Sequence, residues 1–385
     1  MTRQHRNRTA RPPGKTPRKR TSASRALFPL ATLFAIVAMP LGLALPQTFP
    51  SLAMPAAHGH EMLFGFVLAV VAGFLATKVT TAMLWTLVIT WFVARCAGAF
   101  GPLAPVAGLA FPLGVVATTV PPLFAGAKRA QNRIVPLLVT ALLAIDCAWW
   151  ASVSFALHWQ QRLLILTVDL VVLLILIVGG RALQSAVGGH LERSGIKRRD
   201  PVRRGYELPL AALIGTMFVC DAFAQAPAAG ACAFAAAALN VHRVWPWQLH
   251  YTLAHPRLWT LALGYLWLIP GLALKGCAQF GLGIPVTGML HAITIGAIGT
   301  STLVMMARTT LLRARLPFED FRDIGAAAVL LSVAAICRVL AACLPPVTGG
   351  LIPVAAVCWS SAFLILLIRL AAVAHHERTR HASGT

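Results

Sequence analysis

Residues 161–180 read QRLLILTVDLVVLLILIVGG, with one base and one acid among twenty positions. A helix of about 20 mostly apolar residues is long enough to cross the hydrocarbon core of a bilayer, where it satisfies its own backbone hydrogen bonds. The whole chain has this character: 385 residues, 58% hydrophobic and 11% charged, with a mean hydropathy of +0.75. Soluble globular domains carry about 25% charged residues. The sequence therefore predicts an integral membrane protein.

Similar apolar stretches recur along the chain, about twelve in all. They fall at 26–45, 57–78, 82–100, 103–126, 134–156, 161–180, 207–224, 226–241, 258–275, 285–307, 324–343 and 350–374. We therefore expect an all-α polytopic fold with about twelve transmembrane helices. The stretch at 103–126 contains three prolines and that at 226–241 is short and alanine-rich, so these two are the weakest of the set.

The basic residues gather at every second connection between these stretches. Lys and Arg number 33 against 11 acids, a formal charge of +22, and nine of the bases stand in the first 25 residues. Others fall at 127–133, 181–206, 242–257, 308–323 and the C-terminal tail. Because basic loops stay in the cytoplasm, both termini are expected there. The charge thus indicates topology in a lipid bilayer and no nucleic-acid partner.

This topology divides the chain into five expected parts. They are a basic cytoplasmic tail (1–25), a six-span half (26–180), a basic cytoplasmic loop (181–206), a second six-span half (207–374) and a cytoplasmic tail (375–385). The two halves share no convincing sequence repeat. The eight cysteines stand singly without a CxxC motif, so they are expected to be packing residues rather than zinc ligands or sites of covalent haem attachment.

Four of the twelve histidines are expected at one depth, near the outer membrane face: His58, His60, His158 and His291. Burying an imidazole without a partner costs several kcal/mol, so these rings need hydrogen bonds or metal ligation. The other histidines fall in tails or cytoplasmic loops, where solvation is expected. They are His5, His190, His242, His250, His255, His375, His376 and His381.

The segment from His58 to Phe66, HGHEMLFGF, is the densest candidate site. Residues two apart on a helix point to nearly opposite sides, so His58 and His60 can bind one metal only if the chain unwinds at Gly59. Glu61 shares a helix face with His58 and could orient its ring as a hydrogen-bond acceptor. A histidine and glutamate hydrogen-bond cluster without metal is the alternative.

A second candidate lies around His291. Gly288, Ala292 and Gly296 form a stripe of small residues, which permits close helix contact or leaves room for a flat macrocycle. An axial imidazole is a common haem ligand, so His291 at the edge of the stripe is a candidate for that role.

Five charged residues within the spans also need partners: Asp146, Asp169, Asp221, Arg95 and Arg338. Arginine and aspartate pairs that only hold helices together are one interpretation. The two arginines share the expected depth of the outer histidines, so the other is that they bind haem propionates or another anion.

Two sequence blocks resemble the NnrS family. The first is HGHEMLFGF with Ala72-Gly73-Phe74-Leu75 after it, and the second is LHAITIGAIG at 290–299 followed by MARTTL at 306–311. Weaker similarities occur at Gly179-Gly180-Arg181, Trp245-Pro246-Trp247, Leu258-Trp259, Gly264-Tyr265 and Cys337-Arg338-Val339-Leu340. The resemblance spans most of the chain.

This resemblance implies a twelve-helix protein of a bacterial-type cytoplasmic (inner) membrane that contains haem and copper. It also implies an association with denitrification and with defence against nitric oxide and nitrosative stress. His58, His60 and His291 are the matching candidate ligands. No established reaction can be transferred, so enzymatic activity stays open. The chain departs from the family pattern around Lys78, where a Pro-Asn-Trp is absent, at Ala262, where a histidine is common, and at 182–187. The missing histidine could remove one ligand.

Respiratory haem-copper oxidases and secondary transporters are two other classes of membrane protein with about twelve helices. The HPExY copper motif of respiratory haem-copper oxidases is absent from the sequence. A twelve-span proton-coupled secondary transporter is the alternative, with Asp146, Asp169 and the outer histidines as its site. Transport sites usually lie at the bilayer midplane, in matching positions of two halves. Because the four histidines are expected at one outer depth, the metal-binding interpretation is favoured.

Overall fold

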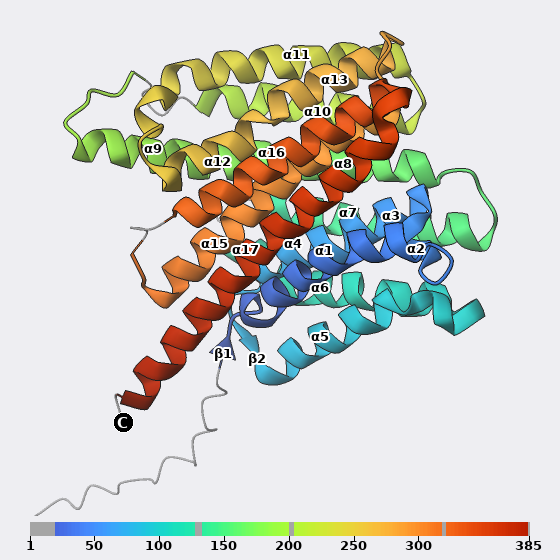
Figure 1. The fold of residues 1–385 in the computed structure, drawn as a ribbon, viewed down its shortest axis with the longest axis horizontal. Coiled ribbons are helices and arrows are strands. Elements are labelled where there is room, and N and C mark those ends of the chain that lie inside the picture. The colour runs from blue at the N-terminus through green and yellow to red at the C-terminus, as the bar shows by residue number, and fades with distance from the viewer. Residues whose placement is uncertain (1–19, 128–132, 200–203, 318–320, 384–385) are drawn as a thin grey trace, which may run out of the picture.

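The computed structural model describes residues 20–127, 133–199, 204–317 and 321–383. Most of the basic tail 1–25 lies outside the described residues, as do parts of the expected loops 127–133, 181–206 and 308–323 and the last two residues of the tail 375–385. Figure 1 shows the described chain as a bundle of helices.

Most of the first half is helical. Its helices are α1 (Ser24–Ala44), α2 (Pro50–Ala53), α3 (Pro55–His60), η1 (Glu61–Val67), α4 (Leu68–Leu75), α5 (Thr81–Arg95), η2 (Ala97–Leu103), α6 (Ala104–Gly126), α7 (Ile134–Ser154), α8 (Gln160–Leu174), η4 (Ile175–Gly179) and α9 (Gly180–Arg193). Two short strands, β1 (Arg20–Thr21) and β2 (Val79–Thr80), pair antiparallel with Arg20 opposite Thr80. This small ribbon joins the start of α1 to the start of α5.

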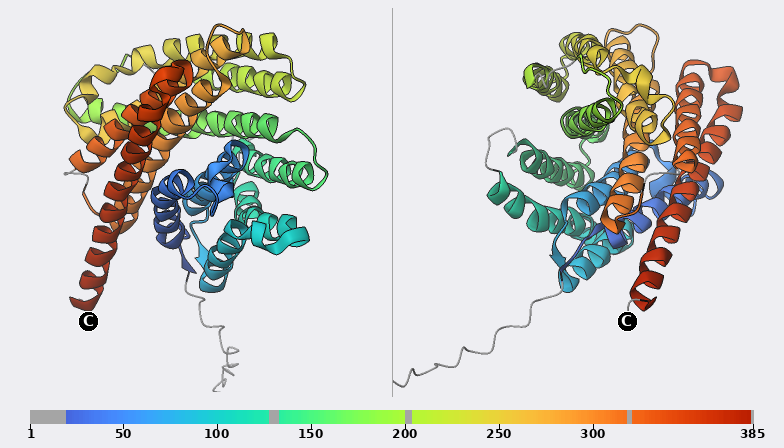
Figure 2. Two further views of the ribbon diagram at one scale, coloured as in Figure 1. Left: turned by 45° about the vertical axis from the view of Figure 1, so that its right-hand side comes forward. Right: turned by 90° about the vertical axis from the view of Figure 1, so that its left-hand side faces the viewer.

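The second half continues the bundle. Its helices are η5 (Arg204–Tyr206), α10 (Glu207–Ala222), α11 (Ala226–Val244), η6 (Trp245–Trp247), η7 (Leu249–Thr252), α12 (Pro256–Leu266), α13 (Leu268–Gln279), α14 (Val286–His291), η8 (Ala292–Gly299), α15 (Thr300–Ala314), α16 (Arg322–Cys343), η9 (Pro345–Val347) and α17 (Thr348–Ser383). Helices α10 and α11 lie on one side of the bundle and α5 and α6 on the opposite side (Figures 1 and 2).

The all-α polytopic fold is confirmed. Within the described residues, nine continuous helical segments are long and apolar enough to cross a membrane. The other three expected segments are also helical, as α5, α10 and α11, but these helices are shorter or less apolar. Each of the twelve apolar stretches therefore corresponds to a helix, and nine meet the length and hydropathy of a full span.

The two described ends of the chain lie at the same end of the bundle. Arg25, at the start of α1, pairs with Glu377 near the end of α17, with 3.3 Å between Nη2 and Oε2. Helix α17 packs along both α16 and α1, which brings the last helix beside the first (Figure 2). An even number of crossings places both ends on one side, so this contact is consistent with twelve segments.

The expected loop 181–206 differs from the structure. Its first part is helix α9, which continues α8 through the π-helical turn η4, and His190 on α9 is buried. The His190 and His255 rings lie 4.4 Å apart, so these two histidines pack together where solvation was expected. Helix propagation from a preceding span is favourable because each added residue gains one backbone hydrogen bond.

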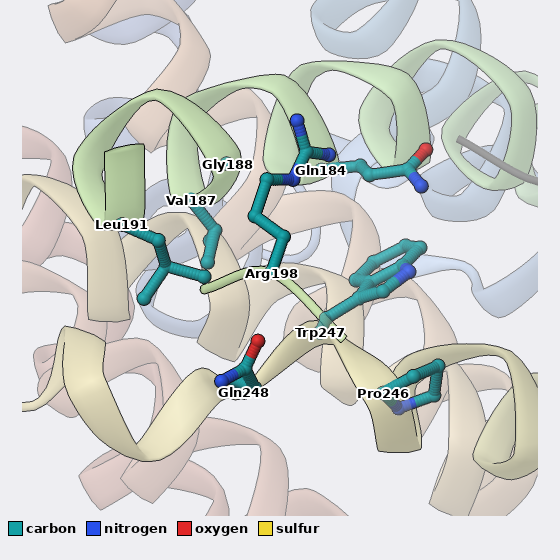
Figure 3. A pocket seen from close by; sticks show the side chains of 8 residues that line it. All are labelled: Gln184, Val187, Gly188, Leu191, Arg198, Pro246, Trp247 and Gln248. Carbon is teal, nitrogen blue, oxygen red and sulfur yellow. The ribbon is translucent and has the colours of Figure 1, made fainter. Parts of the chain in front are cut away.

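After α9 the chain folds back over the helix (Figure 3). The Arg198 side chain lies against Gly188, where a Cβ atom would come within 2.6 Å of the guanidinium carbon. The Arg199 N–H donates to Gln248 Oε1 at 2.9 Å. The cavity at this contact is about 10 Å³, which is room for about one water molecule and no larger ligand. This contact fastens the basic segment to the bundle.

Candidate functional site

Both candidate histidine segments run directly into π-helical turns. The π-helix η1 begins at the residue after His60, and the π-helix η8 begins at the residue after His291. Wide turns of this kind are rare in proteins and occur often at functional sites. They change the rotation of the helix, so side chains before and after the turn face directions that regular α-helical spacing does not give.

His291 and Arg338 form the centre of the first cluster. The His291 Nδ1 atom lies 2.7 Å from the Thr287 carbonyl oxygen, so the ring donates from Nδ1 and its Nε2 is left as the acceptor. Arg338 Nη2 lies 3.1 Å from that Nε2, while the buried Arg338 Nε has no hydrogen-bond partner. Helix α16 thus brings a guanidinium to the free side of an imidazole on α14.

His58 is the third member of this cluster. Its ring lies near the Leu52 backbone and within electrostatic range of Arg338 and His291. The short helix α3 begins at Pro55, about one turn before His58. The φ angle of proline is fixed near the helical value, which favours a helix start at this residue. The structure thus brings together three of the sequence candidates: His58, His291 and Arg338. We call these residues the His58–His291–Arg338 cluster.

His60 belongs to a different environment. Its Nε2 lies 2.6 Å from Asp146 Oδ1 on α7, and both side chains are buried. The ring stacks on Phe64 and on Trp149, with centroid distances of 4.9 and 4.6 Å, and meets Trp150 edge-on. Among the described residues no group of three or more His, Cys, Asp or Glu side chains is arranged to hold a metal ion. His58 and His60 point into different environments, as expected for two residues two positions apart on a helix.

Glu61 binds a different partner from the one expected. Its carboxylate pairs with the Arg95 guanidinium on α5, and no bond from Glu61 to His58 is present in the described part of the chain. The expected orientation of His58 by Glu61 is therefore not observed, because the Arg95 guanidinium from α5 is the partner of the Glu61 carboxylate. Arg95 also lies 5.9 Å above the Phe34 ring, a favourable cation–π position.

A glycine makes room for this ion pair. A Cβ atom at position 65 would come within 2.5 Å of Arg95 Nη1, and the Gly65 carbonyl accepts a bond from Trp91 Nε1 at 2.8 Å. We predict that Gly65→Ala destabilises the protein by about 1–3 kcal/mol, as overpacking of a filled interior does. Gly215→Ala is the control, since a Cβ atom there meets nothing within 4 Å. Thermal unfolding of the two purified variants gives the comparison, and equal midpoints would rule out the tight fit.

The stripe of small residues is a packing surface. A Cβ atom at position 296 would meet the Trp267 ring at 2.5 Å, and one at 288 would meet Ala342 at 3.4 Å. Trp267 itself is held by a 2.9 Å bond from its Nε1 to Ser332 Oγ. The space beside Gly296 is therefore filled by an indole ring, and a flat macrocycle does not fit along this face.

The His58–His291–Arg338 cluster fits an imidazole-bound metal better. A ring whose Nδ1 is anchored by a backbone carbonyl presents Nε2 in a fixed direction, which is the usual arrangement of a metal-ligating histidine. Arg338 now donates to that Nε2 and would have to turn away for a metal to bind. Its unpartnered Nε shows that its hydrogen bonds are incomplete, and an anionic ligand group would complete them.

Two buried basic residues, Lys275 and Arg243, were not predicted from the sequence. Lys275 on α13 ion-pairs with both Asp169 and Asp221, and it is 1% exposed. Arg243, expected in a solvated loop, is 4% exposed and donates to Tyr265 Oη and to the Leu176 carbonyl, both at 2.8 Å. Each residue lies near the end of an apolar stretch, and this position was the only feature of the sequence that could have indicated its burial.

The remaining expected residue lies apart from these clusters. His158 is exposed in the connection between α7 and α8. The segment Gly179-Gly180-Arg181 has a packing role, because a Cβ atom at 180 would come within 2.8 Å of Arg243 Nη2, and Arg181 pairs with Glu207.

The family model described as NnrS protein matches residues 21–378, nearly the whole chain. No curated protein matches the sequence.

Proposed function

The chain belongs to the NnrS family, and from this premise we propose that it is a membrane protein that binds haem or copper through His58 and His291 and acts in the response to nitric oxide. The observation that carries the proposal is the geometry of His291, whose Nδ1 is bonded to Thr287 and whose Nε2 faces Arg338. His58 supplies a second imidazole from another helix. The family membership supplies the class of cofactor and the biological setting.

The proposed division of roles follows from the charges in the cluster. His291 is the principal ligand and His58 the second. Arg338 binds an acidic group of the incoming cofactor, such as a haem propionate, since its planar fork can make two charge-assisted hydrogen bonds to one carboxylate. A haem iron or copper ion held there would supply a coordination position for nitric oxide.

His60 and the Glu61–Arg95 pair have supporting roles in this proposal. The His60 ring is enclosed by three aromatic side chains and bonded to Asp146, so its Nε2 is already occupied. Arg95 is likewise bound to Glu61. These two pairs fix the segment from His60 to Val67 between α5 and α7, directly after His58. They hold the entry of that helix in place and are not assigned as ligands.

The absorption spectrum of the full chain, purified in detergent from cells supplied with haem and copper, tests this proposal. We expect a Soret band or stoichiometric copper, and a spectral change when nitric oxide is added. A colourless, copper-free protein that carries out saturable solute uptake in vesicles would contradict the proposal and favour the transporter alternative.

Arg338→Gln is expected to weaken cofactor binding about tenfold, the lower end of the effect usual for residues that support metal ligands. Arg315→Gln is the control, since Arg315 is an exposed arginine after α15. Haem and copper per protein, measured after dialysis against a chelator and apomyoglobin, compare the two variants. If Arg338→Gln retains as much cofactor as Arg315→Gln, Arg338 does not take part.

A further inference from the structure

A buried group of three charged residues lies apart from the His58–His291–Arg338 cluster. Asp169 on α8, Asp221 on α10 and Lys275 on α13 are 0%, 7% and 1% exposed. The Lys275 ammonium bonds to Asp169 Oδ1 and lies 2.7 Å from Asp221 Oδ2. Asp221 Oδ1 accepts a second bond, from Gln279 Nε2 at 2.6 Å. We call these three residues the Asp–Lys–Asp group.

Its charges do not balance. Two carboxylates and one ammonium leave a net charge of −1 in a segment that is buried within a membrane protein. An isolated ionised carboxylate is so costly in a medium of low polarity that such a group usually takes up a proton instead. Within the described residues no second Lys, Arg or His forms an ion pair with either aspartate.

The neighbouring helices do not supply the missing charge. Asp146 is bonded to His60, and Glu207 pairs with both Arg181 and Arg243 at the other end of α10. His58 and Glu61, near the start of α8, belong to the cluster and the ion pair described above. Arg162 on α8 is exposed and donates to the Ala222 carbonyl at 3.5 Å, and in the described residues it forms no ion pair with Asp169 or Asp221. His242 on α11 bonds to Tyr206, and the remaining titratable groups on α7, α10, α11 and α13 are the thiols of Cys147, Cys220, Cys232 and Cys277.

Two carboxyl oxygens of the Asp–Lys–Asp group lack hydrogen-bond partners. Asp169 Oδ2 and Asp221 Oδ2 are both buried without a hydrogen-bond partner, although the two carboxyl groups interact directly. Asp221 Oδ2 is close to the ammonium but out of line for a hydrogen bond. Buried polar atoms normally have partners, so two unsatisfied oxygens on adjacent acids require an explanation.

We propose that the Asp–Lys–Asp group is a proton-binding site, in which Asp169 is a carboxylic acid that donates from Oδ2 to the Asp221 carboxylate. One proton from water brings the group to zero net charge and gives both oxygens a hydrogen bond. Asp169 holds the proton because it is completely buried, whereas Asp221 is 7% exposed and also accepts from Gln279. Like carboxyl pairs at short distance share one proton. The site is independent of the metal centre proposed above.

Infrared spectroscopy of the full chain in lipid nanodiscs at pH 7 tests this inference. The wild-type protein is expected to show the C=O stretch of a protonated carboxyl group, which shifts when water is exchanged for D₂O. In Asp169→Asn and in Asp221→Asn, the intensity of this band is expected to fall by the contribution of one protonated carboxyl group. Each variant leaves one carboxylate and one ammonium, which need no proton. Asp323→Asn, which alters the partly exposed pair with Arg369 at the start of α16, should keep the band.

Two results would overturn the inference. One is a wild-type spectrum without the band, and this requires no variant to fold. The other is retention of the full band in either Asp169→Asn or Asp221→Asn, since a shared proton depends on both carboxyl groups. The amide I band recorded in the same spectra verifies that each variant is folded.

Discussion

Lys275→Met is expected to lower the free energy of unfolding by about 3–5 kcal/mol, the usual cost of breaking a buried ion pair by removing one partner. Methionine fills most of the volume of lysine, so the effect reports the lost charge and not a cavity. Two buried carboxyl groups are left without the ammonium that forms ion pairs with both of them. The matched control is Lys197→Met, at an exposed lysine after α9.

Chemical unfolding in detergent, followed by circular dichroism, gives the two midpoints. If Lys275→Met is as stable as Lys197→Met, Lys275 does not stabilise the two buried aspartates in the folded protein. The structural account of the group would then fail, whatever its state of protonation.

Asp146→Ala is expected to be the second most damaging substitution, at about 3 kcal/mol. It leaves the His60 ring among Phe64, Trp149 and Trp150 without its partner, and water cannot easily replace the lost carboxylate because both side chains are buried. Asp323→Ala is the control, because its pair with Arg369 is partly exposed and such pairs contribute about 0–1 kcal/mol.

Unfolding midpoints of these two aspartate variants should therefore be well separated. Tryptophan fluorescence adds a local readout, because Trp149 stacks directly on the His60 ring. Equal midpoints, with an unchanged emission spectrum for Asp146→Ala, would show that the His60–Asp146 pair is not formed.

Composition and periodicity are enough to predict the helical class and the position of the twelve segments. Each segment contains about twenty apolar residues between charged or turn-forming residues, and a bilayer leaves no alternative to helix for such a stretch. Counting residues from the charge-poor connections also placed His291 and Arg338 at one depth, and the structure has them 3.1 Å apart. Depth along a span depends on rise per residue, which is constant in a helix.

The partners of the buried polar side chains could not be predicted in the same way. Glu61 was expected to orient His58 from the same helix face, but its carboxylate pairs with Arg95 on α5. The partner of each charge likewise depends on which helices cross. Lys275 meets Asp169 and Asp221 from two other helices, and no local pattern in the sequence encodes that contact. Helix α9 was expected as a loop, and its formation depends on continuation of the helix that starts with α8.

The content of haem and copper per protein in His291→Ala tests the central proposal most directly. His376→Ala, at an exposed histidine near the end of α17, is the matched control. Both variants are purified beside the wild type from cells supplied with haem and copper, and cofactor is measured by absorption and by elemental analysis at equal protein. We predict that His291→Ala loses most of the bound cofactor, while His376→Ala matches the wild type. Wild-type cofactor content in His291→Ala would contradict the proposed site.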